Sequence, residues 1–342
     1  MIRQLHLNSF KVFDELTLNM TKLNILTGCN NSGKSSILQA IRLLDKQKPL
    51  EGLGSLNDFI RGNNSGFDIS CEDVKGRYVK FSSMRDGKPI SNEKRVKSLI
   101  SYISADRYGP RSTLDFGIYG EVDTVGAFGE KIIDFLYQLD TSFMELKVPE
   151  PLRINGGAGV RNNLQEWLRL VSPGVGFDFK TERGANIGWL EFDQHKSIHV
   201  GFGLSYVLPL ILSVLVHASQ MARKDDSQQI LLLVENPEAH LHPAGQTMMG
   251  RLLALGAACG VQILVETHSD HLLNGIRIAV KDKKLEAKDS VIFFFKTIQP
   301  DGIVDSVPYA VVEELHADEY GMINNWPEGF FDETEKNLLK LI

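Results

Sequence analysis

The side chains best suited to chemistry begin at Gly28, where the chain has the G-x-x-x-x-G-K-[ST] spacing of a phosphate-binding loop. An apolar segment at 23–27 precedes the loop and a helical pattern at 36–44 follows it, as a genuine loop of this kind requires. Glycines let successive backbone N–H groups converge on phosphate oxygens, and the start of a helix adds positive potential. The predicted nucleotide-binding residues of this segment are Gly28, Asn30, Asn31, Ser32, Gly33, Lys34, Ser35 and Ser36.

This loop predicts a bound nucleoside triphosphate, and we expect ATP and Mg²⁺ as its cofactors. Lys34 would reach the β- and γ-phosphates, and the hydroxyl of Ser35 would join the Mg²⁺ ligands. The alternative is a glycine turn that binds nothing. The strand before the loop and the helix after it favour the nucleotide.

Two later apolar runs end in residues that would complete such a site. The run at 230–234 ends at Glu235 and has the pattern of a central parallel strand that is buried on both faces. As the carboxylate of a Walker B strand, Glu235 would lie next to the loop and hold Mg²⁺ directly or through water. The run at 261–265 leads to His268, a candidate γ-phosphate sensor for which a purely structural histidine is the alternative.

A glycine and a serine open another helical pattern. Gly203 and Ser205 would offer free backbone N–H groups and a hydroxyl to an anion. The alternative is that Ser205 only caps the N-terminus of a helix over 206–219.

Length and composition set the class of protein. With 342 residues, 43% of them apolar and 23% charged, the chain suits a soluble globular protein with one large domain and an insertion, or with two domains. The apolar run at 206–216 contains Pro209 and is too short to cross a bilayer, so it predicts a buried helix. We expect a cytoplasmic protein with no membrane partner, and three scattered cysteines that form no zinc site.

The charge pattern bears on nucleic acid as a partner. A net charge of -6 gives no global basic footprint of a dedicated nucleic-acid binder. The most basic stretch, 85–97, mixes basic residues with Asp86 and Glu93, which is typical of a solvated face; contact with nucleic acid or a partner is the alternative. Its basic residues are Arg85, Lys88, Lys94, Arg95 and Lys97.

Periodicity predicts the elements that must position the site. Alternation at 2–7 and 16–20 predicts an edge hairpin before the loop strand, and further strands are expected near 67–71 and 77–82. Helical patterns cover 130–138 and 162–170. The predicted fold is α/β, of the P-loop NTPase type, in three parts: 1–87 with the phosphate loop, 88–195 as a compact insertion, and 196–342 with the remaining motifs.

Taken together, four segments resemble the ABC-type ATPase heads of the RecF/SMC/OLD group. The resemblance implies a mixed sheet with flanking helices, an antiparallel N-terminal β-subdomain, and a homodimer that sandwiches ATP. In that dimer Gly203 and Ser205 would contact the γ-phosphate of the opposite subunit. The four segments are the phosphate loop, Gly201-Phe202-Gly203-Leu204-Ser205, Glu235 with the dimer-facing D-loop Pro237-Glu238-Ala239-His240-Leu241-His242-Pro243, and the switch Glu266-Thr267-His268-Ser269.

The chain departs from that family after Glu235. Most such heads have a second acidic residue there, but this chain has Asn236, and an amide is no general base. Asn236 could still position the attacking water, so slow hydrolysis is expected, with Glu238 as a fallback base. The usual glutamine after the first helix is also missing, and Asn57 or Asp58 would replace it.

Three functions follow as hypotheses. The first is an ATP-driven dimerising switch that controls a separate effector, a nuclease or a toxin, in anti-phage defence. The second makes the chain itself a nuclease, but the residues after His268 contain no acidic cluster for one. The third is a DNA-repair ATPase of the RecF type that binds DNA. The apolar and aromatic tail, at 293–295 and 326–331, would pack on the core or dock a partner.

Overall fold

The computed structural model describes most of the chain. The basic stretch at 85–97 lies largely outside the described residues, as do four of its five basic side chains, Lys88, Lys94, Arg95 and Lys97. The described residues are 1–85, 87, 89–91, 96, 98–118, 120–141, 146–223, 229–298 and 309–341, apart from the side chains of 334 and 335.

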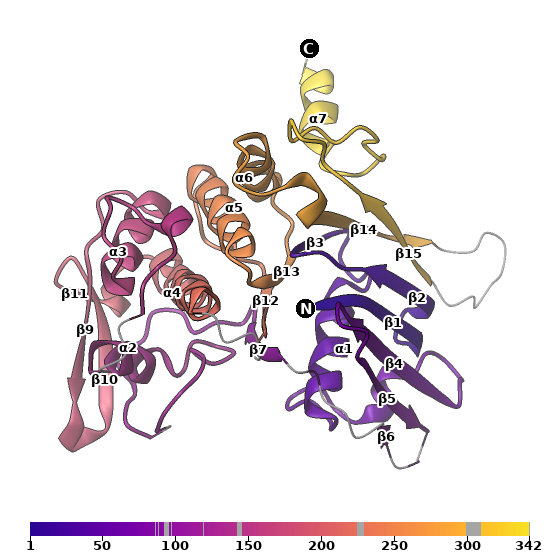
Figure 1. Ribbon diagram of the computed structural model, residues 1–342, viewed down its shortest axis with the longest axis horizontal. Coiled ribbons are helices and arrows are strands. Elements are labelled where there is room, and N and C mark those ends of the chain that lie inside the picture. The colour runs from indigo at the N-terminus through magenta and orange to yellow at the C-terminus, as the bar shows by residue number, and fades with distance from the viewer. Residues whose placement is uncertain are drawn as a thin grey trace.

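A six-stranded sheet forms the centre of the molecule (Figure 1). Five neighbouring strands run parallel and the edge strand β15 runs antiparallel to them, which confirms the predicted α/β fold with a mixed sheet. From edge to edge the strands are β15 (Tyr309–Leu315), β14 (Ser290–Ile298), β3 (Leu23–Gly28), β13 (Gln262–Glu266), β12 (Gln229–Glu235) and β7 (Ser98–Ile103).

Both faces of this sheet are covered, which explains the continuous apolar run of β12. Successive side chains of a strand point to opposite faces. Leu232 and Val234 therefore pack into the core beneath the helical layer, and Leu231 and Leu233 into the core around α1 (Lys34–Lys46). The sheet is thus held rigidly between two hydrophobic layers at the end that carries the candidate site.

The predicted N-terminal hairpin forms, but as part of a second sheet. Strands β1 and β2 pair antiparallel, and the hairpin lies in a five-stranded antiparallel sheet that covers α1. Of the two hairpin strands, β2 lies at an edge of this sheet and β1 lies inside it. The strands expected near 67–71 and 77–82 are its β4 and β5. This sheet contains β2 (Phe13–Asn19), β1 (Ile2–Phe10), β4 (Gly66–Asp73), β5 (Tyr78–Met84) and β6 (Ile90–Ser91).

Helices cover the other face of the central sheet. The predicted buried helix is α4 (Phe202–Ala222), which is apolar around its whole circumference. Among the described residues α4 is also the helix whose length and hydropathy would suit a membrane span, but 78% of that window is buried inside the protein. Beside α4 lie α3 (Val160–Val171) and α5 (Pro243–Ala258), and α6 (Asp270–Lys281) packs on α5. Helix α7 (Glu333–Leu341) projects at the C-terminal end (Figure 1).

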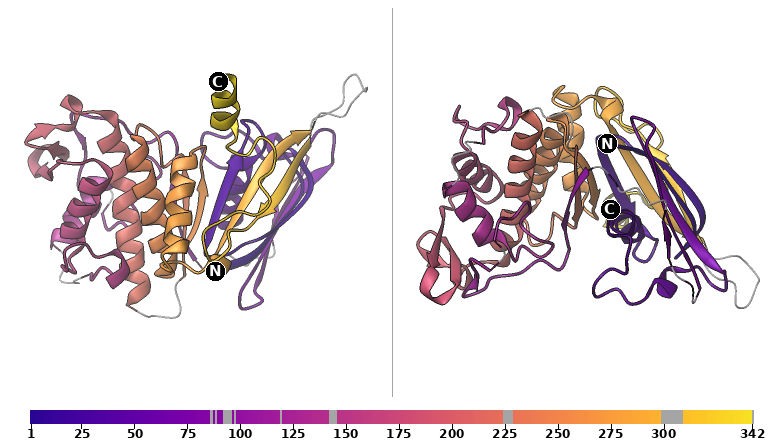
Figure 2. Two further views of the ribbon diagram at one scale, coloured as in Figure 1. Left: turned by 90° about the horizontal axis from the view of Figure 1, so that it is seen from above. Right: turned by 60° about the horizontal axis from the view of Figure 1, so that its bottom comes forward.

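The middle of the chain forms a small subdomain beyond α4 (Figure 2). It contains α2 and α3, close to the helices expected at 130–138 and 162–170, and a small antiparallel sheet. Residues 98–103, which also belong to the predicted insertion, form β7 instead and pair with β12 in the central sheet. The subdomain consists of α2 (Ile132–Thr141), β8 (Leu114–Asp115), β9 (Phe177–Glu182), β10 (Ile187–Phe192), β11 (His195–Lys196) and α3.

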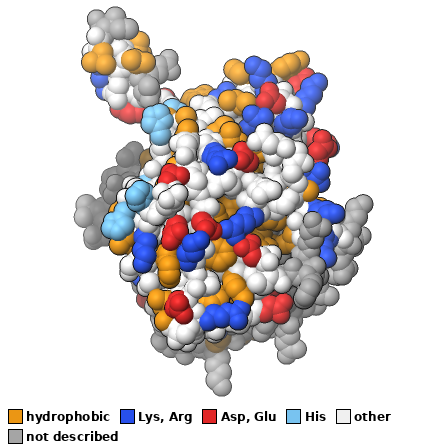
Figure 3. All heavy atoms as spheres, turned by 90° about the vertical axis from the view of Figure 1, so that its left-hand side faces the viewer, with side chains coloured by type: hydrophobic (Ala, Val, Ile, Leu, Met, Phe, Trp, Pro, Cys, Tyr) orange, Lys and Arg blue, Asp and Glu red, His pale blue; other side chains and the backbone are white. Residues whose placement is uncertain are grey.

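The outer face of this subdomain mixes charges of both signs. Figure 3 shows its Lys and Arg side chains next to Asp and Glu rather than gathered in one basic patch. Arg161 pairs with both Asp140 and Asp178, and Lys180 reaches Asp178 at 2.6 Å. Such paired charges leave little free positive potential for a nucleic-acid backbone on this face.

Candidate nucleotide-binding site

The phosphate loop leaves β3 and enters α1 through two glycines that no other residue could replace without strain. Gly28 has φ 131° and Gly33 has φ 98°, both in the region that side chains rarely adopt. A Cβ at Gly28 would lie 2.1 Å from the carbonyl oxygen of Phe295, and one at Gly33 would lie 2.5 Å from the ring of Phe13. The neighbouring strands therefore fix the loop in this shape.

Lys34 is the first residue of α1 and folds back over the loop. Its Nζ donates to the carbonyl oxygens of Gly28 at 3.1 Å and Cys29 at 2.6 Å. Burial lowers the pKa of Lys34, although the nearby carboxylate of Glu266 opposes that shift. The ammonium thus lies at the loop, where phosphate oxygens would take the place of the two carbonyl groups.

The loop, α1 and two strand ends enclose a hollow of about 380 Å³. The hollow brings together most of the predicted nucleotide-binding residues with Asn236 and His268, from segments more than 200 positions apart in the sequence. It is lined by Lys11, Val12, Asn30, Asn31, Ser32, Gly33, Lys34, Ser35, Ser36, Gln39, Asn236, Glu266 and His268.

Glu266, at the end of β13, is a lining residue to which the sequence analysis gave no chemical role. The hydroxyl of Ser35 donates to Oε1 of Glu266 at 3.1 Å, and Oε2 is buried with no hydrogen-bond partner among the described residues. Burial, aided by the nearby Glu235, raises the pKa of Glu266 to about 7. Its position in the sequence could have indicated a role at the site, because Glu266 ends an apolar strand just as Glu235 does.

Glu235 itself does not line the hollow, although the next residue, Asn236, does. One of its oxygens accepts from the hydroxyl of Tyr102 and the other from the backbone N–H of Ala105, each at 3.0 Å. Burial, with the charge of Glu235, raises the pKa of Tyr102 to about 12, so the phenol remains a donor. The predicted metal role of Glu235 stays a prediction, and both of its oxygens are engaged in this state.

Arg107 is a second residue that the sequence analysis missed. It is 2% exposed, and its guanidinium donates to three backbone carbonyl groups, those of Ser104 at 2.7 Å, Glu235 at 2.7 Å and Asn236 at 2.9 Å. Burial lowers the pKa of Arg107 to about 10, which leaves it charged at neutral pH. Arg107 thus fastens the segment after β7 to the end of β12.

The two residues predicted to activate water have different surroundings. Asn236 lines the hollow with φ 44°, and its backbone N–H donates to the carbonyl oxygen of Glu266 at 2.9 Å. Glu238 turns away: its oxygens accept from the Thr267 hydroxyl and the His268 N–H, each at 2.8 Å, and burial raises its pKa. Glu238 therefore connects the D-loop to the switch segment. Its role as a fallback base stays a prediction.

His268 is exposed at the rim of the hollow. Partial burial of the ring lowers the pKa of His268, and the positive charge of Lys34 lowers it further. A neutral imidazole at neutral pH could donate a hydrogen bond to a phosphate oxygen, as the predicted sensor role requires.

Gly203 and Ser205 lie outside the hollow of their own chain. The helix begins at Phe202 with Gly201 as its N-cap, so Ser205 is no cap; its side chain is 5% exposed. Gly203 packs on the D-loop, where an added Cβ would lie 2.8 Å from the carbonyl oxygen of His240. The phosphate that they are predicted to contact would thus have to be bound to a second subunit, and that role stays a prediction.

Lys11 and Gln39 line the hollow, whereas the two residues proposed to replace the missing glutamine do not. The Lys11 ammonium, in the β1–β2 turn, donates to Oε1 of Gln39 at 2.6 Å. Asp58 accepts instead from the N–H of Ser55 at 2.6 Å, and neither Asn57 nor Asp58 lines the hollow. Distance in the sequence hid Lys11, because β2 and β3 lie between it and the loop.

A Mg²⁺ ion fits this site only together with a nucleotide. The described residues contain no group of three His, Cys, Asp or Glu side chains placed to hold a metal ion. The hydroxyl of Ser35 and the buried Glu266 carboxylate are the oxygen donors that Mg²⁺ prefers, and phosphate oxygens would supply further ligands. The unpartnered Oε2 of Glu266 is consistent with a cation at this position.

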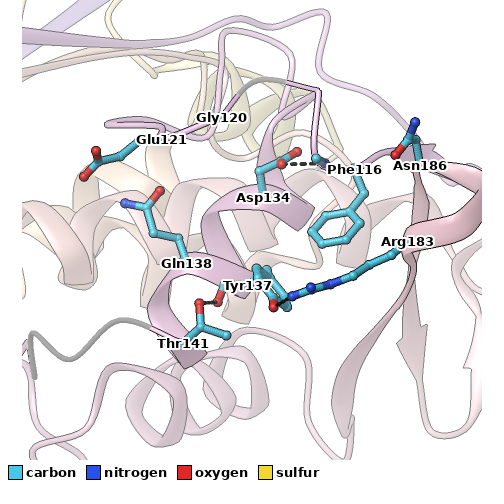
Figure 4. A pocket seen from close by; sticks show the side chains of 10 residues that line it. Phe116, Gly120, Glu121, Asp134, Tyr137, Gln138, Thr141, Arg183 and Asn186 are labelled. Atoms are coloured by element: carbon cyan, nitrogen blue, oxygen red, sulfur yellow. Dashed lines mark hydrogen bonds between the residues drawn. The ribbon is translucent and has the colours of Figure 1, made fainter.

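A cavity larger than this hollow lies elsewhere in the described part of the chain. It measures about 610 Å³ and belongs to the middle subdomain, between α2, the segment after β8 and the segment around Asn186 (Figure 4). Phe116 and Tyr137 meet edge to face at 5.0 Å in its wall, and Asp134 accepts from the N–H of Gly117 at 2.7 Å. None of the phosphate-loop residues lines it, so size alone does not locate the nucleotide site.

Comparison with known families agrees with this geometry. The chain matches the family described as "AAA ATPase domain" over residues 1–102 and 185–273, which together are more than half of its length. The chain belongs to the AAA ATPase domain family. The matched ranges contain the phosphate loop, Glu235 and His268, and they omit most of the middle subdomain of this ATPase domain protein.

The ATPase domain is also similar to individual proteins, in sequence to RecF and in structure to SMC heads. Over 71 residues it is 41% identical to the DNA replication and repair protein RecF of Idiomarina loihiensis, a segment that spans 20% of each chain. The SMC head bound to the C-winged helix domain of ScpA superposes with a TM-score of 0.58 at 16% identity, covering 92% of this chain and 98% of that one. A Pyrococcus furiosus Smc head with an extended coiled coil gives 0.54 at 12%, covering 99% of each. The ABC-type head fold is thus confirmed.

The C-terminal part of the ATPase domain protein matches a second family, described as "Protein of unknown function (DUF3696)", over residues 285–341. The aromatic tail in this part packs on the core, as one of the two alternatives predicted. Phe330 is fully buried, with its ring 5.2 Å from that of Phe294 and 4.7 Å from that of Trp326. The same segment borders a cleft of about 310 Å³ that also contains Cys29 and His268.

Proposed function

We propose that this protein binds and slowly hydrolyses ATP, dimerises around the nucleotide, and uses closure of the dimer to control a separate effector protein. By resemblance to the OLD-type heads, the effector would be a nuclease or a toxin in anti-phage defence, and the system would act in the cytoplasm. ATP is the expected substrate and Mg²⁺ the expected metal.

The observation that carries this proposal is that Gly203 and Ser205 do not line the nucleotide hollow of their own chain, whereas the phosphate loop, Asn236 and His268 do. The lining of the hollow comes from the phosphate loop, the β1–β2 turn, α1 and the ends of β12 and β13. In the dimer that the resemblance implies, Gly203 would contact the γ-phosphate of the opposite subunit. In this chain Gly203 packs on the D-loop, outside the hollow. A second copy would bring its Gly203 over the hollow of the first, and the nucleotide would hold the two together.

The residues of the hollow suit slow hydrolysis. The backbone N–H groups of the loop and the Lys34 ammonium would hold the phosphates, and Mg²⁺, when bound, would neutralise phosphate charge. Asn236 would orient the attacking water without removing its proton, and His268 would donate to the γ-phosphate. Because an amide is no general base, stabilisation of charge would supply most of the rate.

The tail offers a route from the nucleotide to a partner. His268 and Phe330 border the same cleft, and α7 follows directly after this segment. Leu338, Leu339 and Leu341 of α7 are 56%, 70% and 82% exposed, an unusual density of apolar side chains for a solvated helix. These leucines are the surface on which we propose that the effector docks.

Dimerisation is tested by sedimentation velocity with ATP, a non-hydrolysable ATP analogue or ADP. We expect a dimer with ATP or its analogue and a monomer with ADP. Lys34→Ala should abolish the dimer through loss of binding. Phe202→Glu should retain ATP binding and lose the dimer, because Phe202 is 55% exposed beside Gly203. A wild-type protein that binds ATP and stays monomeric at all concentrations would refute the dimer.

Control of an effector is tested by copurification in ATP and in ADP, with Leu339→Glu as the variant of the docking surface. A partner captured in one nucleotide state, and lost from the variant, supports the proposal. A partner captured equally in every state would speak against control by the nucleotide.

A RecF-type DNA-binding ATPase is the second candidate function, favoured by the 71-residue match to RecF. The net charge of -6 and the mixed charges of the subdomain face argue against DNA binding. Titration with duplex DNA at several salt concentrations separates the two candidates. Binding that weakens steeply as salt increases would favour the RecF-type function.

A further inference from the structure

We propose that the cavity of the middle subdomain is a second ligand site, which binds the base of a small nucleotide through an N–H group that donates to Asp134. The inference does not rest on the proposed function, because none of the phosphate-loop residues lines this cavity. Its volume of about 610 Å³ lies in the range of small-molecule sites in proteins. The middle subdomain would thus recognise a ligand of its own, apart from ATP at the phosphate loop.

One side of α2 faces this cavity. Residues that are three, four and seven positions apart lie on the same side of a helix, and four lining residues of α2 have this spacing. The residues between them belong to the hydrophobic core, so α2 presents its polar side to the cavity. The four lining residues are Asp134, Tyr137, Gln138 and Thr141.

The carboxyl group of Asp134 is the part of this wall that lacks a partner. Asp134 is 6% exposed, and its Oδ1 accepts from the N–H of Gly117 at 2.7 Å. Its Oδ2 is buried and has no hydrogen-bond partner within the residues that the structure describes. A buried carboxylate oxygen without a donor is destabilising. A ligand N–H group in the cavity would supply the missing donor.

Two aromatic rings line the cavity together with this carboxyl group. The rings of Phe116 and Tyr137 meet edge to face, with their centroids 5.0 Å apart. In the view of Figure 4 the Phe116 ring lies between Asp134 and the side chain of Arg183. Aromatic side chains bind bases by stacking, since every base has a flat face. The wall therefore suits a flat ligand that carries an N–H donor on its edge.

Arg183 favours a base over an organic amine as that ligand. Its guanidinium lies 5.1 Å from the centroid of the Tyr137 ring and donates to the Tyr137 hydroxyl. An ammonium group bound at Asp134 would share the cavity with this like charge. A nucleotide instead has N–H donors on its base and acceptor oxygens on its phosphate, so one ligand can satisfy both Asp134 and Arg183.

The test uses Lys34→Ala, in which the phosphate loop should no longer hold a nucleotide. This variant would be titrated calorimetrically with the 5′-monophosphates of guanosine, adenosine, cytidine and uridine. Ribose 5-phosphate, which has no base, and tyramine, an aromatic amine, are the comparison ligands. We expect at least one of the nucleotides to bind with a Kd below about 1 mM, and both comparison ligands to bind at least about 10-fold more weakly.

Variants of the cavity, made in the same Lys34→Ala chain, locate the bound nucleotide. Asp134→Asn keeps an acceptor for the Gly117 N–H but replaces the unpartnered oxygen by a donor, and should lose about 10-fold to 100-fold in affinity. Arg183→Ala changes an exposed side chain and should lose about 10-fold, which tests the site even if Asp134→Asn is unstable. Asp140→Asn, an exposed position of the same helix, is the matched control and should bind as the parent does. Thermal unfolding shows whether each variant is folded.

Three results would overturn the inference. If none of the four nucleotides binds, or if ribose 5-phosphate binds equally well, the cavity does not recognise a base. Tighter binding of tyramine would identify the cavity as a site for an amine. Unaltered affinity in a folded Asp134→Asn, or in Arg183→Ala, would place the nucleotide elsewhere on the chain. ATP binding by the wild-type protein is measured separately, so none of these results decides the proposed function.

Discussion

Arg107 donates a hydrogen bond to the carbonyl oxygen of Asn236 at 2.9 Å and so holds a residue whose φ is 44°. The same guanidinium binds the carbonyl oxygens of Glu235 and Ser104. The turn that follows the Walker B strand therefore takes its shape from a side chain of a distant segment. The three carbonyl groups lie where β7 and β12 end, so Arg107 joins the ends of these two strands.

Replacing Arg107 should destabilise the whole protein. Arg107→Ala would leave three carbonyl groups without a donor in a buried site, and we expect a loss of about 3 kcal/mol in the free energy of unfolding. Urea unfolding followed by circular dichroism measures this loss. Arg169→Ala is the matched control, because Arg169 is half exposed in a pair with Glu166, and it should cost less than about 1 kcal/mol. Equal losses for the two variants would disprove the role of Arg107.

Asn236→Glu tests how water is activated. The variant supplies the acidic residue that most resembling heads have, so ATP turnover should rise or stay unchanged. It should also lose about 1 kcal/mol of stability, because φ 44° suits asparagine better than glutamate. Phosphate release at saturating ATP measures the rate. Asn236→Gln, which keeps an amide at the same backbone angle, is the control. A collapse of Asn236→Glu to the background of Lys34→Ala would mean that the amide itself is essential.

The stability of the nucleotide-free protein should depend on pH through Glu266. Burial raises its folded pKa to about 7 from an ordinary value of 4.5, so between these values the folded state binds a proton that the unfolded state releases. The stability linked to this proton is present below pH 4.5 and is lost as pH rises through 7. The difference amounts to roughly 3 kcal/mol, at about 1.4 kcal/mol for each pH unit.

Thermal unfolding of wild type and Glu266→Gln between pH 5 and pH 8 checks this prediction, in buffer without metal or nucleotide. The wild-type Tm should fall relative to that of Glu266→Gln as pH rises, because the glutamine cannot ionise. Glu286→Gln, which removes an exposed carboxylate, should follow the wild-type profile. Parallel profiles for wild type and Glu266→Gln would contradict the expected titration.

The three cysteines should differ in reactivity. Cys29 is exposed in the phosphate loop, whereas burial raises the pKa of Cys71 to about 12 and that of Cys259 to about 11. A thiol-specific chromogenic disulfide should therefore label one site quickly in the native protein and all three in denaturant, since the thiolate is the reacting form. ATP with Mg²⁺ should slow the fast phase, and Cys29→Ser should remove it. A fast phase that persists in Cys29→Ser would contradict this assignment.

The aromatic tail should contribute to stability rather than only to partner binding. Phe330→Ala removes a fully buried ring that contacts Phe294 and Trp326, and we expect it to cost about 3–5 kcal/mol. Leu341→Ala, at a side chain that is 82% exposed, should change stability by less than about 0.5 kcal/mol. Calorimetric unfolding measures both. A Phe330→Ala protein as stable as wild type would show that the tail is not part of the core.

The sequence alone determined the parts of this protein that depend on neighbours along the chain. The spacing of Gly28, Gly33 and Lys34 predicted the phosphate loop, and the apolar runs before Glu235 and His268 predicted buried parallel strands, because turn geometry and strand burial leave local patterns. The continuous apolar pattern of α4 likewise predicted a buried helix. These predictions needed no knowledge of which strand lies next to which.

Only the tertiary structure decided which side chains meet. Strand order put β13 between β3 and β12, and so placed Glu266 rather than Glu235 at Ser35. Arg107 reaches the end of β12 across 128 positions of sequence, and Lys11 reaches the hollow from a hairpin in the other sheet. Such contacts follow from strand pairing and packing between layers, which depend on the whole chain at once and leave no pattern in any single segment.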